Sequence, residues 1–281
     1  MTTRLRRSAL YLPASNARAI SKARTLPCDV VILDLEDAVA PDAKDVARAQ
    51  AVAAVREGGF GTRELVIRVN GADTDWGETD IAALASAAPD AILVPKVSSG
   101  ADIEDYAERI GGTVPIWAMV ETAASLLRLD EIGATATRGR LACLVMGTND
   151  LAKELGAEPG IDRLPFVGAL GLSVAAARAH GLAILDGVFN DLDDEAGFTR
   201  QARQTVAFGF DGKTLIHPGQ IAPCNLAFMP DEAAVTWARR ILAAFDEPEN
   251  ADKGAIRVEG HMVERLHLHA ARRVLAASNA T

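Results

Sequence analysis

The stretch Val30-Val31-Ile32-Leu33-Asp34-Leu35-Glu36-Asp37 shows the pattern that decides the fold, an apolar run that ends directly in acidic residues. Such a run, with little polar alternation, is typical of a strand covered on both faces. Similar runs recur along the chain at Ser8–Leu12, Leu65–Val69, Ala91–Pro95, Ile116–Val120, Leu141–Met146, Ala183–Leu185 and Thr214–Ile216. Helix-like segments lie between them: Asn16–Thr25, Ala43–Arg56, Thr79–Ala87, Ile103–Ile110, Thr122–Leu129, Pro165–His180 and Asp194–Ala207. Eight strand–helix units in series predict an α/β fold, a closed (β/α)8 TIM barrel with right-handed crossovers.

An open doubly wound sheet is the alternative for a chain that alternates strands and helices. Its dinucleotide-binding form carries a G-x-G-x-x-G motif after the first strand, and no such motif follows Ser8–Leu12. Gly58-Gly59-Phe60-Gly61 comes after a helix instead, which indicates a helix C-cap and a loop. We therefore expect a catalytic barrel over residues 1–229.

Residues 230–281 have a different organisation. A predicted helix, Glu232–Phe245, leads into a polar linker, Asp246–Gly254, and the segment Ala255–Ser278 ends in another helix. This part is too short to fold alone. We expect a small C-terminal helical extension that packs on the barrel or on a neighbouring subunit as a lid.

Composition excludes several classes of function. The 281 residues carry a net charge of −9, which argues against nucleic-acid binding because that requires a basic face. Cys28, Cys143 and Cys224 form no CxxC pair, so neither a disulfide framework nor a zinc knuckle is indicated. The N-terminus lacks the apolar core of a signal peptide, and no stretch is long and apolar enough to span a membrane. The expected location is the cytoplasm.

Polar side chains follow the predicted strands, at the end of a barrel where active sites lie. In strand order, from the second to the eighth, they are Asp34 to Asp37, Arg68 with Asn70, Lys96, Glu121, Gly147-Thr148-Asn149-Asp150, Asp186 and His217. Each acid has a plain structural explanation: Asp150 would suit a helix N-cap, and Glu121 would suit a helix start. Together, several acids at one rim would repel unless a cation neutralised them. Oxygen ligands without a His or Cys cluster indicate Mg²⁺, with Mn²⁺ as the alternative.

Two basic residues at the same rim each allow two interpretations. Arg68 is either the ion-pair partner of Asp34 or Glu36, or a fork that binds a substrate carboxylate. Lys96 is either a salt-bridge partner of a nearby acid or the nucleophile of a Schiff-base aldolase. The surrounding acids favour the ammonium form of Lys96, which argues against the nucleophile.

Seven motifs in order resemble one known family. They are Arg7-Ser8 with Leu10-Tyr11-Leu12-Pro13, Asp34-Leu35-Glu36-Asp37-Ala38-Val39 with Lys44, Arg68-Val69-Asn70, Pro95-Lys96-Val97, Val120-Glu121-Thr122-Ala123, Gly147-Thr148-Asn149-Asp150-Leu151, and Ile216-His217-Pro218-Gly219-Gln220-Ile221. From Arg7 to about Leu275 the chain resembles the citrate lyase beta-subunit-like proteins of the HpcH/HpaI aldolase family, which include malyl-CoA and citramalyl-CoA lyases.

The resemblance implies a set of roles. Glu121 and Asp150 would hold Mg²⁺, and Arg68 would bind the carboxylate of a 2-oxo acid, with Glu121 lying against that substrate. The backbone of Gly147, Thr148 and Asn149 would cradle the same carboxylate. Glu36 and Asp37 would take part in catalysis by hydrogen-bonding metal-bound waters. The family also implies a homotrimer or a larger assembly of trimers.

One motif departs from the family pattern. The CoA-ester lyases carry Gly-x-Met-[Ile/Val]-Asp in the tail, and the Asp of a neighbouring subunit handles the enolate proton. This chain has Gly260-His261-Met262-Val263-Glu264. Glu264 is one methylene longer and retains acid–base capacity, so we expect it to take the catalytic part of that Asp.

The reaction that the resemblance implies is Mg²⁺-dependent cleavage or formation of a 3-hydroxyacyl-CoA thioester of the malyl-, citramalyl- or citryl-CoA type. Its partners would be a 2-oxo acid and an acyl-CoA. Three alternatives remain open at this stage: a thioesterase such as malyl-CoA hydrolase, a class II aldolase that uses free aldehydes, and a citrate lyase beta subunit that acts on an acyl-carrier-protein thioester.

Overall fold

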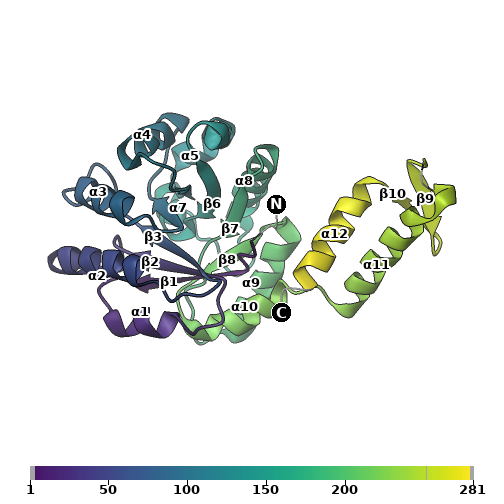
Figure 1. The fold of residues 1–281 in the computed structure, drawn as a ribbon, viewed down its shortest axis with the longest axis horizontal. Coiled ribbons are helices and arrows are strands. Elements are labelled where there is room, and N and C mark those ends of the chain that lie inside the picture. Colours follow the sequence, from purple (N-terminus) through teal and green to yellow (C-terminus); the bar gives the residue numbers. More distant parts are fainter. Residues whose placement is uncertain (1–3, 251, 279–281) are drawn as a thin grey trace. The chain divides into compact units, whose positions relative to one another are not determined.

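The structure is a computed structural model and describes residues 4–250 and 252–278. Eight parallel strands close into a barrel in chain order (Figure 1). They are β1 (Ser8–Pro13), β2 (Val30–Asp34), β3 (Glu64–Arg68), β4 (Ala91–Val94), β5 (Ile116–Val120), β6 (Leu141–Met146), β7 (Ala183–Asp186) and β8 (Gly212–Leu215). The predicted (β/α)8 fold is therefore confirmed, and the predicted bounds of β5 and β6 agree with the structure.

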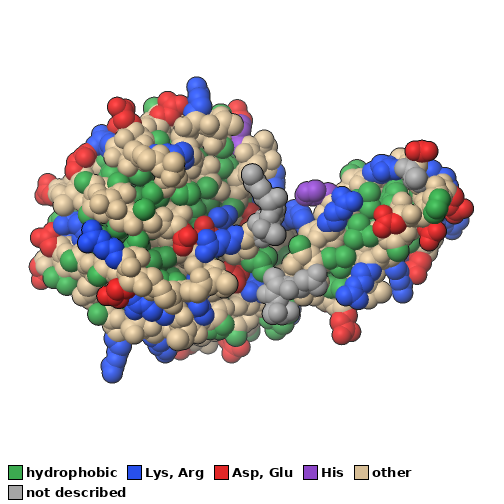
Figure 2. Space-filling model, viewed as in Figure 1, with side chains coloured by type: hydrophobic (Ala, Val, Ile, Leu, Met, Phe, Trp, Pro, Cys, Tyr) green, Lys and Arg blue, Asp and Glu red, His purple; other side chains and the backbone are tan. Residues whose placement is uncertain are grey.

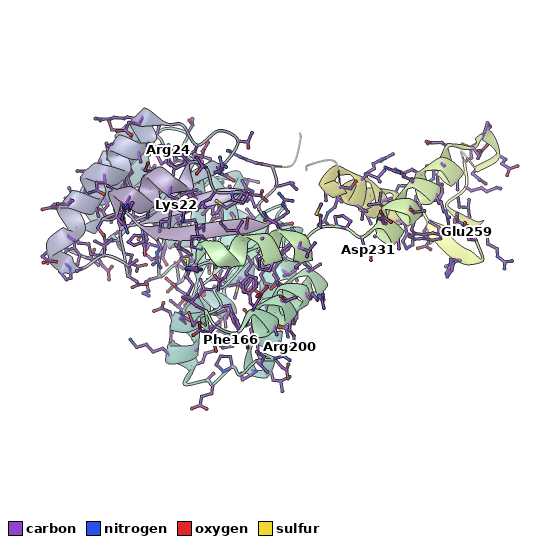
Figure 3. The ribbon with its side chains drawn as sticks, turned by 90° about the horizontal axis from the view of Figure 1, so that it is seen from below. Lys22, Arg24, Phe166, Arg200, Asp231 and Glu259 are labelled. Carbon is purple, nitrogen blue, oxygen red and sulfur yellow. The ribbon has the colours of Figure 1, made fainter. Side chains whose placement is uncertain are left out.

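Helices between the strands and after β8 surround the barrel (Figure 1). They are α1 (Ala17–Ala23), α2 (Lys44–Glu57), α3 (Gly77–Ala87), α4 (Gly100–Ile110), α5 (Ala123–Leu127), α6 (Leu129–Ala134), α7 (Thr148–Leu155), α8 (Val167–Ala179), α9 (Glu195–Phe208) and α10 (Ile221–Ala227). The barrel unit also has four short 3-10 helices, which are η1 (Pro41–Ala43), η2 (Thr135–Thr137), η3 (Leu164–Phe166) and η4 (Pro218–Gln220). Labelled side chains on or beside these helices are seen in Figure 3, with Lys22 in α1 and Arg200 in α9.

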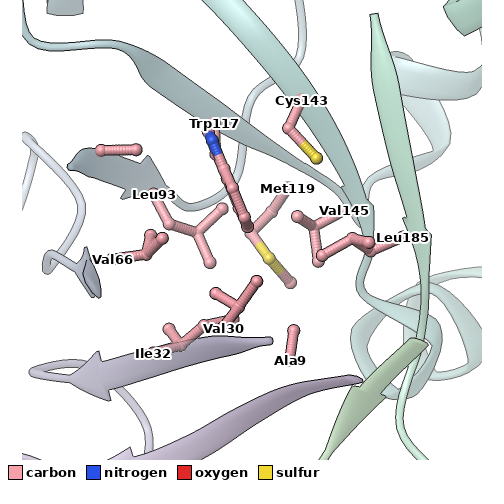
Figure 4. Close-up of a cluster of buried hydrophobic side chains, with 11 residues drawn as sticks. Ala9, Val30, Ile32, Val66, Leu93, Trp117, Met119, Cys143, Val145 and Leu185 are labelled. Carbon is pink, nitrogen blue, oxygen red and sulfur yellow. The ribbon is translucent and has the colours of Figure 1, made fainter. Parts of the chain in front are cut away.

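The barrel interior is a packed apolar core. Side chains from several strands meet there, including Ile32, Leu93, Trp117, Met119 and Val145 (Figure 4). Trp117 is the largest of the fully buried side chains. Burial of this apolar area is the main favourable contribution to folding, and a filled interior keeps the strand ends in fixed positions. Polar groups at those ends are thus held on a rigid support.

The last strand begins earlier than the apolar run predicts. The expected strand was Thr214–Ile216, whereas β8 starts at Gly212 and includes Lys213. A Cβ at Gly212 would overlap the carbonyl oxygen of Arg6, so only glycine allows β8 to approach the chain before β1 this closely. The sequence signal was hidden because the strand opens with a glycine and a charged residue.

A second compact unit contains Phe228–Thr281 together with Met1–Leu5, and the barrel unit contains Arg6–Ala227. The second unit has helices α11 (Glu232–Asp246) and α12 (Leu266–Ser278), the 3-10 helix η5 (Pro248–Asn250), and an antiparallel pair of strands, β9 (Ala255–Val258) and β10 (His261–Glu264). Its core includes Ile241, Phe245 and Val263.

The β9–β10 hairpin was not expected, because the extension was predicted to be helical. Glu259 and Gly260 form its turn and both have positive φ, +47° and +89°. Two successive residues of positive φ characterise the type I′ turn that two-residue hairpin loops prefer. Glu-Gly is a weaker signal for that turn than Asn-Gly or Asp-Gly, which explains why the strands were missed.

On the face shown in Figure 2, basic and acidic side chains are intermixed over the barrel. Among the described residues, the helices are too short or too polar to cross a bilayer.

Candidate active site

The loops that follow the carboxyl ends of the barrel strands form what we call the barrel mouth. Strand register sets which polar residues are neighbours there. Asp34 of β2 is paired with Arg68 of β3, so their side chains leave adjacent strands at the same level. Glu121 follows β5, and Gly147 follows β6, the strand beside it. The mouth therefore brings together acids and bases that are distant in sequence.

Arg68 is the centre of the first cluster. Its Nε and Nη2 donate to the two carboxylate oxygens of Asp34 at 2.7 and 2.6 Å, while Nη1 lies 2.9 Å from Glu36 Oε2 and donates to Asp37 Oδ2 at 3.2 Å. The guanidinium carbon is 5.1 Å from the centre of the Tyr11 ring. Arg68 and Asp34 are only 8% and 1% exposed. This pair is the structural ion pair that one interpretation of Arg68 anticipated.

The remaining edge of Arg68 has a different environment. Asp34 takes the Nε–Nη2 edge, and Nη1 is shared by two acids that are less buried, with side chains 13% exposed for Glu36 and 60% for Asp37. A ligand carboxylate could therefore compete for Nη1 without disturbing Asp34. The two interpretations of Arg68 are compatible.

Lys44 holds the loop that carries Glu36 and Asp37. Its buried Nζ donates three bonds of 2.7 Å each, to the carbonyl oxygens of Leu35 and Glu36 and to Asn70 Oδ1. The Asn70 amide donates in turn to the Leu35 carbonyl at 2.9 Å. All three ammonium protons are used, so Lys44 is a scaffold residue of the mouth.

Glu121, Lys96 and Asp150 form the second cluster. The Lys96 backbone N–H donates to Glu121 Oε1 at 2.7 Å, and Lys96 Nζ lies 2.8 Å from Asp150 Oδ1 and 3.7 Å from Glu121 Oε1. Glu121 is 1% exposed. A Cβ at Gly147 would overlap the Glu121 side chain, so glycine at this position makes room for the carboxylate.

The pKa values of this cluster reflect burial and charge. Burial raises the pKa of Glu121, although the Lys96 N–H and ammonium oppose the shift. Burial alone would lower the pKa of Lys96, but the Asp150 hydrogen bond and the nearby carboxylates outweigh it and raise that pKa. A Schiff-base nucleophile needs a lowered amine pKa. The structure therefore favours the salt-bridge interpretation of Lys96.

The donor set at Glu121 and Asp150 fits a hard divalent cation. Glu121 Oε2 is buried and has no hydrogen-bond partner, and the two carboxylates already share one cation, the Lys96 ammonium. Within residues 4–250 and 252–278 no group of three or more His, Cys, Asp and Glu side chains is placed to bind a metal. Two carboxylates are nevertheless the usual protein contribution to a Mg²⁺ site, where water and substrate supply the other oxygens.

Asp186 departs from the predicted rim position, and the helix N-cap alternative for Asp150 is ruled out. Asp186 is fully buried and bonds to Arg163 Nη1 at 2.7 and 2.8 Å, to Thr205 and to Lys213. Burial alone would raise the pKa of Asp186, but Lys213 and Arg163 lower it. Asp150 is not a helix N-cap, because α7 begins at Thr148 with Gly147 as its cap residue. Asp186 therefore belongs to a buried ion cluster rather than to the mouth.

The segment after β6 is held by the segment after β7. Thr148 packs closely against Gly187, because a Cβ at Gly187 would overlap the Thr148 hydroxyl. Asn149 and Asn190 exchange side-chain hydrogen bonds of 2.8 and 3.3 Å. Asn190 was not predicted, because it lies beyond the end of β7, where no spacing rule applies.

Tyr11 was also missed as a mouth residue, although its motif was noted. Its ring lies under Arg68, and its hydroxyl is 3.5 Å from Met119 Sδ, a weak acceptor. Its position in β1, beside β2, could have been inferred from barrel closure. His217, in contrast, has a local role, since its Nδ1 accepts from the Gly219 N–H and so caps η4.

Glu36 supports a pH-dependent prediction. Burial raises its pKa to about 8 despite the Arg68 ion pair. Between the unfolded pKa near 4.5 and the folded value, the native state binds the extra proton, so the free energy of unfolding falls as pH rises. We expect the stability of Glu36→Gln relative to wild type to increase by about 3 kcal/mol between pH 5 and pH 9 in EDTA, a value discounted for partial exposure. Urea unfolding at both pH values measures this difference, and a pH-independent difference would contradict it.

The chain is a (β/α)8 barrel whose mouth holds a candidate metal centre, the paired carboxylates of Glu121 and Asp150. Residues 7–218 match the HpcH/HpaI aldolase/citrate lyase family, and the chain belongs to that family. It is 48% identical over 274 residues to a (3S)-malyl-CoA thioesterase of Cereibacter sphaeroides, covering 98% of this chain and 95% of the relative.

The chain is also similar to two relatives that have other names. It is 36% identical to an L-malyl-CoA/beta-methylmalyl-CoA lyase of Cereibacter sphaeroides, over 92% of this chain and 90% of that protein. It also resembles the structure of CitE from Mycobacterium tuberculosis in complex with magnesium, acetoacetate and coenzyme A, with a TM-score of 0.79, 30% identity and 98% of both chains covered.

Proposed function

We propose that this chain is a Mg²⁺-dependent enzyme that acts on the CoA thioester of a short 3-hydroxy dicarboxylic acid, of the malyl-CoA type, and hydrolyses it to the hydroxy acid and CoA. The observation that carries the proposal is the pairing of Glu121 and Asp150 around the Lys96 ammonium, at a mouth that also holds Arg68. The 48% identity to a thioesterase favours hydrolysis over the carbon–carbon cleavage expected from sequence.

Glu121, through its unpartnered Oε2, and Asp150 would hold the metal. Mg²⁺ is favoured over Mn²⁺ by the magnesium complex of the homologous CitE protein. Such a cation supplies Lewis acidity toward the oxygens of a bound substrate. The protein's part is to keep two carboxylates close together on rigid strand ends.

The substrate carboxylate is assigned to Arg68 and to the start of α7. Arg68 offers its Nη1 edge, and Glu121 would lie against the same substrate. The Gly147 N–H donates to the Val120 carbonyl oxygen at 3.0 Å and is occupied. The N–H groups of Thr148 and Asn149 open α7, where N–H groups lack helical partners and bind anions. A dicarboxylic acyl group is therefore the expected substrate class.

Hydrolysis requires a proton carrier. A water oxygen bonds to the thioester carbonyl carbon, the carbon–sulfur bond breaks, and a proton passes from that water to the departing CoA sulfur. We assign this transfer to Glu36, because its Oε2 lies at the mouth, 2.9 Å from Arg68 Nη1, and because burial raises its pKa to about 8 in the metal-free protein. Asp37 accepts a hydrogen bond from the same Arg68 Nη1, and we assign it to hydrogen-bond the water.

Carbon–carbon cleavage is the second candidate, and the 36% identity to a lyase favours it. It would yield a 2-oxo acid and an acyl-CoA, and it needs an acid that protonates the carbon of the thioester enolate. Glu264, half-buried at the end of β10, is the candidate. That it reaches the mouth of a neighbouring subunit in a trimer remains a prediction. Hydrolysis needs no acid that protonates carbon. The replacement of the family Asp by the longer Glu264 therefore affects hydrolysis less than it affects carbon–carbon cleavage.

Product analysis with (3S)-malyl-CoA distinguishes the two reactions. We expect malate and free CoA in the presence of Mg²⁺ and their loss in EDTA. Glyoxylate and acetyl-CoA would establish the lyase instead. Turnover that persists in EDTA, or trapping at Lys96 by borohydride, would rule out the metal proposal.

A further inference from the structure

Lys96 has an unusual backbone conformation. Its φ is +54°, in the left-handed region that a non-glycine side chain rarely adopts. Such a conformation costs on the order of 1 kcal/mol or more and persists where surrounding contacts stabilise it. Here the stabilising contact is the bond from the Lys96 N–H to Glu121 Oε1, at 2.7 Å. The strained turn after β4 therefore fixes one oxygen of Glu121.

The other oxygen of Glu121 is left open. Oε2 is buried and has no hydrogen-bond partner, which is a costly state for a carboxylate oxygen unless a ligand completes it. The two oxygens of Glu121 therefore differ. Oε1 accepts a hydrogen bond from the Lys96 N–H, and Oε2 is available to a ligand.

The side chain of Lys96 joins the same two acids. Its ammonium lies 2.8 Å from Asp150 Oδ1 and 3.7 Å from Glu121 Oε1. The side chain is 47% exposed, whereas that of Glu121 is 0% exposed. A flexible, solvent-accessible cation is therefore placed against the acids that we propose as metal ligands, and it can move away without unfolding any buried element.

We infer that Lys96 is an exchangeable counter-ion of the metal centre: its ammonium neutralises Glu121 and Asp150 when no metal is bound and is displaced by a divalent cation. This inference rests on the proposed Mg²⁺ site. Lys96 acts as a positioning residue through its N–H and as a competitor of the metal through its ammonium. The competition makes metal binding weaker than the two carboxylates alone would give, and it keeps the buried charge neutralised in the metal-free protein.

The test compares Lys96→Met with wild type by isothermal titration calorimetry with MgCl₂. Methionine keeps the backbone N–H and a similar length but removes the charge. We expect Lys96→Met to bind Mg²⁺ about tenfold more tightly, because an ion pair at a partly exposed site is worth about one factor of ten. Lys153→Met, an exposed charge removal on α7, should change the affinity less than twofold, and Lys96→Arg should stay near wild type.

A second measurement does not depend on the metal. In EDTA we expect the Tm of Lys96→Met to fall by about 3 °C, because Glu121 and Asp150 lose their counter-ion. If wild type binds Mg²⁺ and Lys96→Met binds it no more tightly, the exchange is refuted while the metal site stands. If wild type does not bind Mg²⁺ at millimolar concentration, the proposed function fails. The EDTA measurement then decides the counter-ion role alone, and an unchanged Tm would overturn it.

Discussion

Replacement of Glu121 by glutamine is expected to lower kcat/KM for the CoA thioester by on the order of a thousandfold, and to weaken Mg²⁺ binding at the same time. Glutamine is the same size and keeps an oxygen for the Lys96 N–H, but it carries no charge for a cation. The loss should appear in kcat/KM measured at saturating Mg²⁺. Glu154→Gln, an exposed neutralisation on α7, is the matched control and should leave the rate unchanged.

Stability separates this loss of function from misfolding. Because burial raises the pKa of Glu121, its charged form is disfavoured in the metal-free protein. The neutral variant should therefore be at least as stable as wild type in EDTA, as is common where a functional group is held in a costly environment. Glu121→Gln with turnover within tenfold of wild type would contradict its assignment as a metal ligand. A lower Tm in EDTA would instead indicate a structural role.

The barrel and its mouth could be predicted because both follow from local patterns. Each parallel strand is buried on two faces and so appears as an apolar run, and the side chain at its end must lie at the mouth. This rule listed Glu121 and Asp150 among the acids of the mouth, and the family resemblance singled them out as metal ligands. Which acid pairs with Arg68 could not be decided from the sequence, because the choice depends on strand register. The bidentate bond between Asp34 and Arg68 follows from their register on β2 and β3.

The same limit explains the errors. Asp186 ends an apolar run like the other acids, but Lys213 and Arg163 approach it from β8 and from the loop before η3. No pattern within one segment reveals such partners. The β9–β10 hairpin was missed for a different reason, since its turn uses Glu259 where Asn or Asp is usual. Local signals therefore identified the elements, and tertiary contacts decided which acids remained available.

The second large prediction is that Arg68 binds the substrate carboxylate. Its test requires a variant that keeps the positive charge of the side chain. Arg68→Ala would leave Asp34 buried and unpaired, at a cost of about 3–5 kcal/mol in the free energy of unfolding. Arg68→Lys keeps a cation for Asp34 but has no planar fork, so it cannot bind Asp34 and a ligand carboxylate together. We expect its KM for the thioester to rise roughly a hundredfold, with a smaller change in kcat.

A buried arginine elsewhere in the barrel provides the control. Arg163 is 3% exposed and bonds to the buried Asp186 through Nη1. Arg163→Lys should therefore lower Tm by an amount similar to Arg68→Lys while leaving KM near wild type. If the two variants lose stability equally and neither changes KM, Arg68 is only the partner of Asp34. A KM that rises for Arg68→Lys alone would show that its Nη1 edge binds substrate, because both variants weaken the ion pair of a buried carboxylate and only Arg68 lies at the mouth.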